Sequence, residues 1–278
     1  WTDIANWTNG VAPTATKDSN VQVSANNPII SETTGASVKN LDVGASAALT
    51  VASGGSLSVS GDFTNSGGTV TLNSTEDDFS SLIVTGTATG DITYNRFVNS
   101  YDDGLGGGWD LVGSPTVMTI EDFITANGAN IQVLGNDYAF SQYDNTIDQW
   151  LRYATASQAG SFTSGQGYSM ATVSDGPPPP GAAGTTVAFT GTMQTADQSI
   201  NVINNNGLNG VGRRWNLVSN PFPSYIAGNT AAQTTNNFMD VNSGVIDESF
   251  LGVYGWNGSS YTTYNFTSDA FSIAPGQG

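Results

Sequence analysis

The residues of this sequence best suited to chemistry are carboxylates and amides in turns. Asp240 and Asn242 begin a D-x-N-x-G stretch, which has the form of the first half of a calcium-binding loop, and Asp247 and Glu248 follow it. Ca²⁺ takes about six to eight oxygen ligands from such side chains and from backbone carbonyls. The twelfth position, where such a loop carries an acid, is Leu251. Solvated turn residues are the simpler interpretation, and a Ca²⁺ site at Asp240, Asn242, Asp247 and Glu248 is the alternative.

Catalytic chemistry is harder to place, because the chain contains no cysteine and no histidine. Thiolate catalysis and disulfides are thereby excluded, and a serine triad would lack its usual base. No two carboxylates are marked by their neighbours as the facing pair that glycoside hydrolysis needs. Lys17 and Lys39 are the only lysines, and neither has the context of a lyase base. We therefore expect no enzyme, and a fragment of a polysaccharide-degrading enzyme is the third choice.

The charge of the chain limits its partners. It contains 23 acidic and 6 basic residues, which gives a formal net charge of -17. Such a field repels phosphate backbones and anionic lipid, so we expect no nucleic acid partner. No apolar run is long enough to span a bilayer, and we expect no membrane insertion. The same charge favours at least one bound cation, so Ca²⁺ is the one cofactor that we consider.

Short apolar pairs separated by turn residues fill the first third of the chain. Leu41-x-Val43, Leu49-x-Val51 and Leu57-x-Val59 follow one another at a constant, short spacing. Each pair is a strand of period 2, too short to bury a face alone, and stacked rungs would cover one another. We interpret the spacing as a rung repeat and predict a parallel β-helix or solenoid over residues 1–92. The alternative is a meander of antiparallel hairpins.

The rest of the chain contains a repeat. Trp109-Asp-Leu-Val-Gly-Ser-Pro115 returns as Trp215-Asn-Leu-Val-Ser-Asn-Pro221, and Phe162-Thr-Ser-Gly-Gln-Gly167 returns as Ile273-Ala-Pro-Gly-Gln-Gly278. Matched landmarks at a nearly constant offset indicate a duplicated unit. We predict two related β-sandwich units, residues 93–193 and residues 194–278, with the second incomplete at its C-terminal end.

Alternating strands and one helical turn should build these units. A helical turn is expected over residues 121–126, with Thr119 as its N-cap. The segment Pro177–Pro180 cannot join a strand ladder, and we interpret it as a protruding hairpin loop, with a stiff linker as the alternative. The expected strands cover residues 94–98, 109–112, 138–143, 149–153, 168–173, 187–193, 200–203, 215–218, 251–256 and 261–266.

Aromatic residues are the remaining candidates for ligand binding. Trp109, Trp150, Trp215 and Trp256 could stack on sugar rings, but repetition at fixed positions favours inward anchors of a sandwich core. The better candidates for an exposed pair are two residues near the N-terminal end. These are Trp1 and Trp7, which either bind a ligand or cap the first rung.

Several segments resemble those of a known family. The stretch from Trp1 to Thr14 resembles the N-W-x-N-G-x-x-P opening of adhesin-like surface proteins of Bacteroidota. The segment from Gly61 to Leu72 looks like the filamentous rungs that follow this opening. The segments Trp215–Ile226, Val253–Gly258 and Ile273–Gly278 are similar to the modules that close such proteins. The resemblance implies export by the type IX secretion machinery and attachment to the outer membrane, and it carries no catalytic residues with it.

The sequence thus favours an extracellular or cell-surface location. We expect a structural, adhesive segment of a large secreted or cell-surface bacterial protein. It would serve as a stalk, fibre or filament component and as a type IX secretion cargo, with self-association into fibres and glycans as its partners. The alternative is a carbohydrate-binding module that uses surface aromatics.

Overall fold

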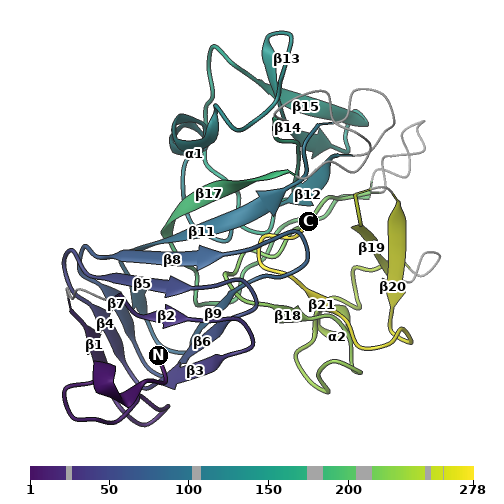
Figure 1. The fold of residues 1–278 in the computed structure, drawn as a ribbon. Helices are drawn as coiled ribbons and strands as arrows, with labels where there is room; N and C mark the ends of the chain where they lie inside the picture. Colours follow the sequence, from purple (N-terminus) through teal and green to yellow (C-terminus); the bar gives the residue numbers. More distant parts are fainter. Residues whose placement is uncertain (23–26, 102–107, 174–183, 205–214, 248–251, 259) are drawn as a thin grey trace.

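A computed structural model describes residues 1–22, 27–101, 108–173, 184–204, 215–247, 252–258 and 260–278. Strands account for 40% of the chain and helices for 6%, which confirms the predicted all-β class. The N-terminal part is a parallel β-solenoid of about 3 turns, as predicted. The strands of residues 110–170 lie beyond its last turn, and the short strands at residues 226–227 and 272–273 lie beside it (Figure 1).

Three sheets form the sides of the solenoid. The first contains β1 (Ser19–Val21), β4 (Leu41–Val43), β7 (Phe63–Asn65) and β10 (Ala88–Thr89). The second contains β2 (Ile29–Ile30), β5 (Ala48–Val51), β8 (Thr69–Asn73), β11 (Asp91–Val98) and the antiparallel β17 (Thr185–Thr192). The third contains β3 (Gly35–Val38), β6 (Ser56–Val59) and β9 (Ser81–Val84).

The register corrects the predicted length of a rung. Leu41 of β4 pairs with Phe63 of β7, and Leu49 of β5 pairs with Val70 of β8, so none of the described solenoid strands pairs with the next one in the chain. The strands β4, β5 and β6 are consecutive sides of one turn. The short spacing from Leu41 to Leu49 therefore measures the distance from side to side, and the rung repeat is the longer one. The prediction that this spacing is the rung repeat was wrong because a solenoid turn has three corners, each of which adds its own residues.

Alternate residues of each strand fill the interior of the solenoid. The side chains of Leu49, Val51, Leu57 and Leu72 are almost fully buried, and their neighbours in sequence point outward. Burial of each such side chain contributes about 1.5–3 kcal/mol. Stacking of the turns thus supplies the stability that a chain with so few cations cannot take from ion pairs. Within the described residues one salt bridge is found, between Lys39 and Asp18 at 3.6 Å.

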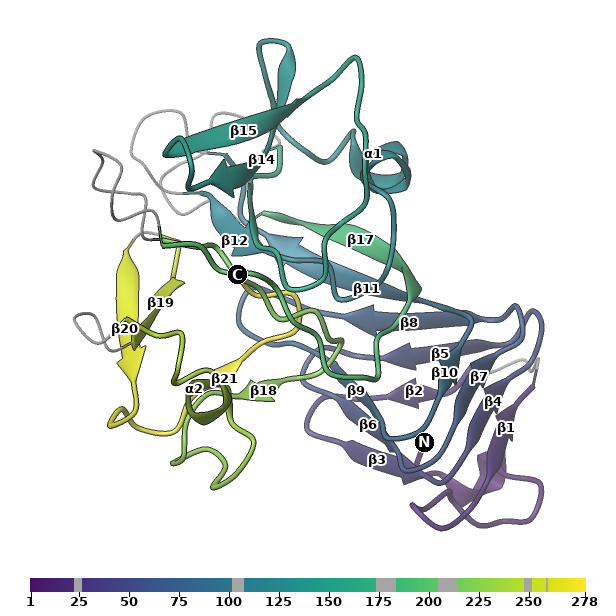
Figure 2. The same cartoon turned by 180° about the vertical axis from the view of Figure 1, so that it is seen from behind.

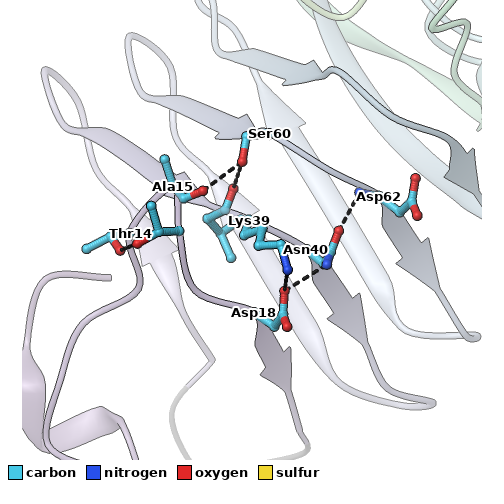
Figure 3. A network of polar contacts seen from close by, with 9 residues as sticks. Thr14, Ala15, Asp18, Lys39, Asn40, Ser60 and Asp62 are labelled. Carbon is cyan, nitrogen blue, oxygen red and sulfur yellow. Dashed lines mark hydrogen bonds and ion pairs between the residues drawn. The ribbon is translucent and has the colours of Figure 1, made fainter.

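A ladder of polar side chains runs along the outside of the first sheet, from turn to turn (Figure 3). Asn40 Nδ2 donates to Asp18 Oδ1 at 2.7 Å, and Asn40 Oδ1 accepts from the backbone N–H of Asp62 at 2.8 Å. Asp62 Oδ1 then accepts from both the N–H and the hydroxyl of Thr87, at 2.8 and 2.7 Å. Each rung is thereby bonded to the next by side chains as well as by backbone.

The predicted boundary between residues 92 and 93 falls inside β11, because this strand pairs with β8 on one side and with β17 on the other. The solenoid therefore continues directly into the first repeat copy. The helix α1 (Ile120–Asn127) covers β17, and Thr119 caps it by accepting from the N–H of Asp122, which confirms the predicted helical turn. Asn127 bonds to both the N–H and the carbonyl of Ala188 in β17.

The described strands between β11 and β17 form one antiparallel sheet. Its members are β12 (Asp110–Val112), β16 (Tyr168–Met170), β14 (Asp137–Asp144), β13 (Val133–Leu134) and β15 (Gln149–Ala154). Rings from α1, β14, β16 and β17 meet behind this sheet, and Phe123 stacks on Phe189 with 4.8 Å between ring centroids. This aromatic core joins the first copy to the end of the solenoid.

The second copy has less regular structure. Its strands form two pairs, β18 (Ile226–Ala227) with β21 (Ser272–Ile273) and β19 (Gly252–Trp256) with β20 (Tyr261–Asn265), and its helix α2 (Phe238–Val241) is one turn long. A short 3-10 helix, η1 (Ile4–Asn6), lies at the N-terminal end. Residues 200–203 form no strand, and residues 215–218 form only a bridge from Val218 to Gln166. The side chain of Asn216 bonds to both the N–H and the carbonyl of Ile203, so an amide replaces the ladder expected there.

The two copies pair reciprocally. In the first copy's Trp-x-Leu-Val segment, Gly113 N–H donates to the carbonyl of Gly276, and the Leu111 carbonyl accepts from Gly278. In the second copy's segment, the Leu217 carbonyl accepts from Gly167 and Ser219 N–H donates to Gly165, at 3.0 and 2.8 Å. Each Trp-x-Leu-Val segment therefore bonds to the Gly-Gln-Gly segment of the other copy. The copies are related by an approximate two-fold axis and are not strung along a line.

Gly113 and Ser219 lie against each other at this axis, although they are equivalent positions of the repeat. A Cβ added at Gly113 would lie 1.9 Å from Ser219 Oγ and 2.3 Å from its Cβ. Ser219 Oγ donates to the carbonyl of Gln166 at 2.8 Å. The axis has room for one side chain only, so the two copies must differ here.

The second copy also binds the solenoid directly. Leu82 N–H in β9 donates to the carbonyl of Pro223 at 2.7 Å, and Tyr225 Oη donates to the carbonyl of Phe79 at 3.4 Å. The buried guanidinium of Arg96 lies over the Phe79 ring, 4.5 Å from its centroid, and burial lowers the pKa of Arg96. Both repeat copies are thus fixed to the solenoid, and the three parts form one body (Figure 2).

Substitution of Gly113 by serine should destabilise the pairing of the copies. The clash with Ser219 should lower the free energy of unfolding by about 1–3 kcal/mol, measured by thermal and denaturant melting. The double variant Gly113→Ser, Ser219→Gly should recover most of the loss, because it moves the one side chain to the other copy. A double variant no more stable than the single one would contradict the two-fold pairing.

The ladder predicts a pH effect at Asp62. The hydrogen bonds from Thr87 hold the pKa of Asp62 below its usual value. This stabilising contribution is therefore present above the ordinary carboxyl pKa and is lost as the pH falls through the depressed one. Replacement of Thr87 by valine should raise the Asp62 pKa, observed by NMR titration of the carboxyl carbon. Thr89→Val, on the strand β10 that begins directly after Thr87, is the control, and an equal shift in both variants would contradict the assignment.

Candidate ligand-binding cavity between the repeat copies

Trp1 and Trp7 form a cap on the solenoid, which was the second of their two expected roles. Their rings meet edge to face at 5.2 Å, and Trp7 Nε1 donates to the carbonyl of Trp1 at 2.9 Å. Trp1 packs against the buried core, and its amino group donates to the carbonyl of Ile29 in the first turn. Both side chains are half-buried, so they are better placed to cover the first rung than to hold a ligand.

The four residues of the predicted calcium site are only partly placed. Asp240 lies in α2, where its carboxylate accepts from Asn237 Nδ2 at 2.6 Å and from Thr230 Oγ1 at 3.1 Å. Asn242 Nδ2 donates to the carbonyl of Phe238. Asp247 is half-buried, and Glu248 lies outside the described residues. Within the described residues no group of three or more acidic side chains could hold a metal ion, so Ca²⁺ binding stays a prediction.

The prediction that the tryptophans of the repeat are core anchors is wrong. Trp109 and Trp256 are half-buried, and Trp256 Nε1 donates to the carbonyl of Trp109 at 2.6 Å. Trp150 and Trp215 are 45% and 41% exposed. None of these four indoles belongs to the buried core, which in the first copy is built from phenylalanine and tyrosine rings. The segment Pro177–Pro180, the predicted hairpin loop, lies outside the described residues.

Each hairpin carries an aromatic pair across its two strands beside the turn. Tyr143 of β14 faces Trp150 of β15 with 5.3 Å between ring centroids, and Trp256 of β19 faces Tyr261 of β20 with 4.9 Å. Cross-strand aromatic pairs stabilise a hairpin. The copies thus share this feature. Each hairpin also bonds to the Trp-x-Leu-Val segment of the other copy, through Trp256 to the carbonyl of Trp109 and through Asn145 to the side chain of Asn216.

A cavity of about 720 Å³ lies where these elements meet. The first copy contributes Leu111, Tyr143 and Trp150 to its wall. The second contributes Trp215 and its neighbours, the hairpin β19–β20, and residues around β18 and β21. The volume is within the usual range for small-molecule sites, about 300–1,000 Å³. The exposed tryptophans Trp150 and Trp215 both line it, and so does Tyr261, which is 57% exposed.

The described residues of the two copies pack differently beside the cavity. In the first copy Phe123, Phe140 and Phe162 pack together behind the sheet with centroid distances of 5.2–5.8 Å. The described residues of the second copy form no such cluster; its helix α2 is a single turn, and Phe238 lines the cavity. The cavity thus lies beside the copy whose described residues lack this cluster.

The lining carries no Asp, Glu, Lys or Arg among its described residues. Its polar groups are amides, hydroxyls and backbone groups, and they include Ser272, Gln277 and the phenols of Tyr254 and Tyr264. Desolvation raises the pKa of Tyr261, so its phenol stays protonated at neutral pH. Such a surface can stack on a ligand and exchange hydrogen bonds with it, but it offers no general base at neutral pH.

The sequence directed the search for a binding site to residues that differ between the copies, and first to the segment Pro177–Pro180 of the first copy. That segment lies outside the described residues. The spacing could not show that Trp150 and Trp215, which lie far apart in the chain, face one cavity. That proximity depends on the reciprocal pairing.

These features define an all-β protein in which a capped solenoid carries a two-fold pair of repeats with one open cavity. The family model described as "Domain of unknown function (DUF8693)" matches residues 1–273, and the chain belongs to this family. No curated protein and no solved structure matches the chain. None of the described helices is long and apolar enough to cross a membrane.

The exposure of the two cavity tryptophans can be tested by fluorescence quenching with acrylamide. Replacement of Trp150 and Trp215 together by phenylalanine should remove most of the readily quenched emission, because the remaining tryptophans are more buried. The matched control is Trp109→Phe, which should leave the quenchable part almost unchanged. Equal quenching of the double variant and the wild-type chain would contradict the described cavity.

Proposed function

We propose that this chain is a non-catalytic adhesive segment of a secreted or cell-surface bacterial protein. The observation that carries the proposal is the aromatic cavity, whose described lining residues are all uncharged. Hydrolysis and elimination both need a group that moves a proton at neutral pH. A neutral, partly exposed aromatic surface instead serves recognition.

The position of the cavity relative to the solenoid supports an adhesive function. The hairpin β19–β20 lies on the side of the molecule away from β1 and the N-terminal end in both views (Figures 1 and 2). The solenoid, with its bonded ladder and its capped first turn, serves as a rigid base that presents the cavity. The Trp1–Trp7 cap does not favour stacking of one solenoid on the first rung of another, so among the expected roles we prefer adhesion to growth of a filament.

The resemblance to adhesin-like surface proteins of Bacteroidota supports an extracellular location. Export by the type IX secretion machinery and attachment to the outer membrane are parts of this proposal. The net charge of -17 would keep such a segment soluble and separate from anionic surfaces. Carbohydrate binding through surface aromatics remains compatible with adhesion, because it would supply the contact.

The proposal is tested by coupling the chain to beads. Its amino groups, at Trp1, Lys17 and Lys39, all belong to the solenoid part of the chain, so coupling through amines leaves the cavity free. Coated beads should adhere to bacterial and algal cells under flow more strongly than beads coated with serum albumin. Reducing-sugar assays on the same cells should show no product. Adhesion no greater than that of the albumin control, or steady release of sugar, would contradict the proposal.

A further inference from the structure

The two exposed tryptophans of the cavity are held in fixed orientations. Trp150 is held against Tyr143, and the Trp215 ring meets Tyr254 edge to face at 4.8 Å. An exposed indole that is held by a second ring loses little conformational entropy when a ligand stacks on it. The rings are therefore preorganised platforms and not loosely packed surface residues.

The polar groups of the cavity suit a ligand rich in hydroxyl groups. Gln277 Oε1 accepts from the N–H of Ala274 at 2.9 Å, which fixes the amide at the wall of the cavity and orients its Nε2. The hydroxyls of Ser272, Tyr254 and Tyr264 can each donate and accept. A proline-rich peptide, another ligand of aromatic grooves, offers carbonyl acceptors but no backbone donors. The hydroxyl groups of a ligand can both donate hydrogen bonds to these side chains and accept hydrogen bonds from them.

Charge decides between neutral and anionic ligands. The described lining has no cation to pair with a carboxylate or a sulfate, and the chain as a whole carries a net charge of -17. A uronate or a sulfated polymer would therefore be repelled at a distance, and the described lining residues would not pair with it. The chemistry favours an uncharged ligand.

We propose that the cavity between the repeat copies binds a neutral oligosaccharide, or a neutral segment of a polysaccharide, whose sugar faces stack on Trp150 and Trp215. The C–H face of a pyranose is weakly positive and matches the negative face of an indole. Tyr261, at the rim, provides a further ring. This inference rests on the non-catalytic adhesive function proposed above and names the class of ligand for the same site.

The test is an array of soluble neutral glycans, including β-glucans, mannans and xylans, beside alginate, polygalacturonate and a sulfated galactan. Isothermal titration of the best neutral oligosaccharide follows. We expect binding to neutral glycans only, and a loss of affinity of about tenfold or more for Trp150→Ala and for Trp215→Ala. Trp→Phe at the same positions should retain part of the affinity, and thermal melting verifies that each variant is folded.

The matched controls lie on or beside the strands of the cavity. Leu151→Ala changes an exposed residue next to Trp150 on β15 that does not line the cavity, and Phe266→Ala does the same beside β20. Neither should change affinity. The proposal is overturned if no neutral glycan binds, if charged glycans bind better, or if the tryptophan variants bind as the wild type does. It is also overturned if a decaproline peptide binds in a Trp150- and Trp215-dependent manner and no glycan does.

The bead assay separates this inference from the proposed function. Beads coated with Trp150→Ala, Trp215→Ala chain that still adhere fully would overturn the sugar site and leave the adhesive function standing. If the chain binds soluble glycan through these tryptophans but its beads do not adhere, the sugar site stands and the adhesive function is overturned.

Discussion

The backbone hydrogen bonds that join each Trp-x-Leu-Val segment to the Gly-Gln-Gly segment of the other copy determine the arrangement of the repeat region. Glycine is needed on one side of this contact because the chains approach closely. A Cβ at Gly167 would lie 2.5 Å from Leu217 Cγ, and a Cβ at Gly278 would lie 2.9 Å from the carbonyl carbon of Leu111. The sequence repeats these glycines because the contact itself is repeated, once in each direction. Neither copy can complete its pairing alone.

This reciprocity has an energetic consequence. Each backbone bond contributes about 0.5–1.5 kcal/mol net, and the partners of the first copy lie far along the chain, with Leu111 bonded to Gly278. Closing so long a loop costs conformational entropy. Several hydrogen bonds that form together, and the attachment of the second copy to β9 of the solenoid, offset this cost. The solenoid is by contrast built from pairings that span a single turn, such as Leu41 with Phe63 and Leu49 with Val70.

Local patterns in the sequence predicted the local parts of the structure. Period-2 apolar pairs indicated the solenoid strands, and Thr119 indicated the start of α1, because alternation and capping depend on neighbours in the chain. The rung length was wrong for a related reason: Leu41, Leu49 and Leu57 show the spacing of sides, and the closure of a turn depends on corner lengths that no single pair reveals. The pairing of the copies could not be read at all, since a Gly-Gln-Gly segment has the same sequence whether it bonds to its own copy or to the other.

The tryptophans show why the candidate site needed the structure. An indole suits a core and a binding surface equally well, and only the space behind it decides between them. In the first copy the space behind the sheet is filled by Phe123 and its neighbours, and Trp150 lies outside this core. In the second copy Trp215 lies beside the cavity. Because the pairing is reciprocal, Trp150 of the first copy and Trp215 of the second line the same cavity. A duplication that had strung its units in a line would have kept these two rings apart. The cavity thus depends on the two-fold contact and on the differences between the copies across it. One such difference is at Gly113 and Ser219, where only one of the two copies can carry a side chain.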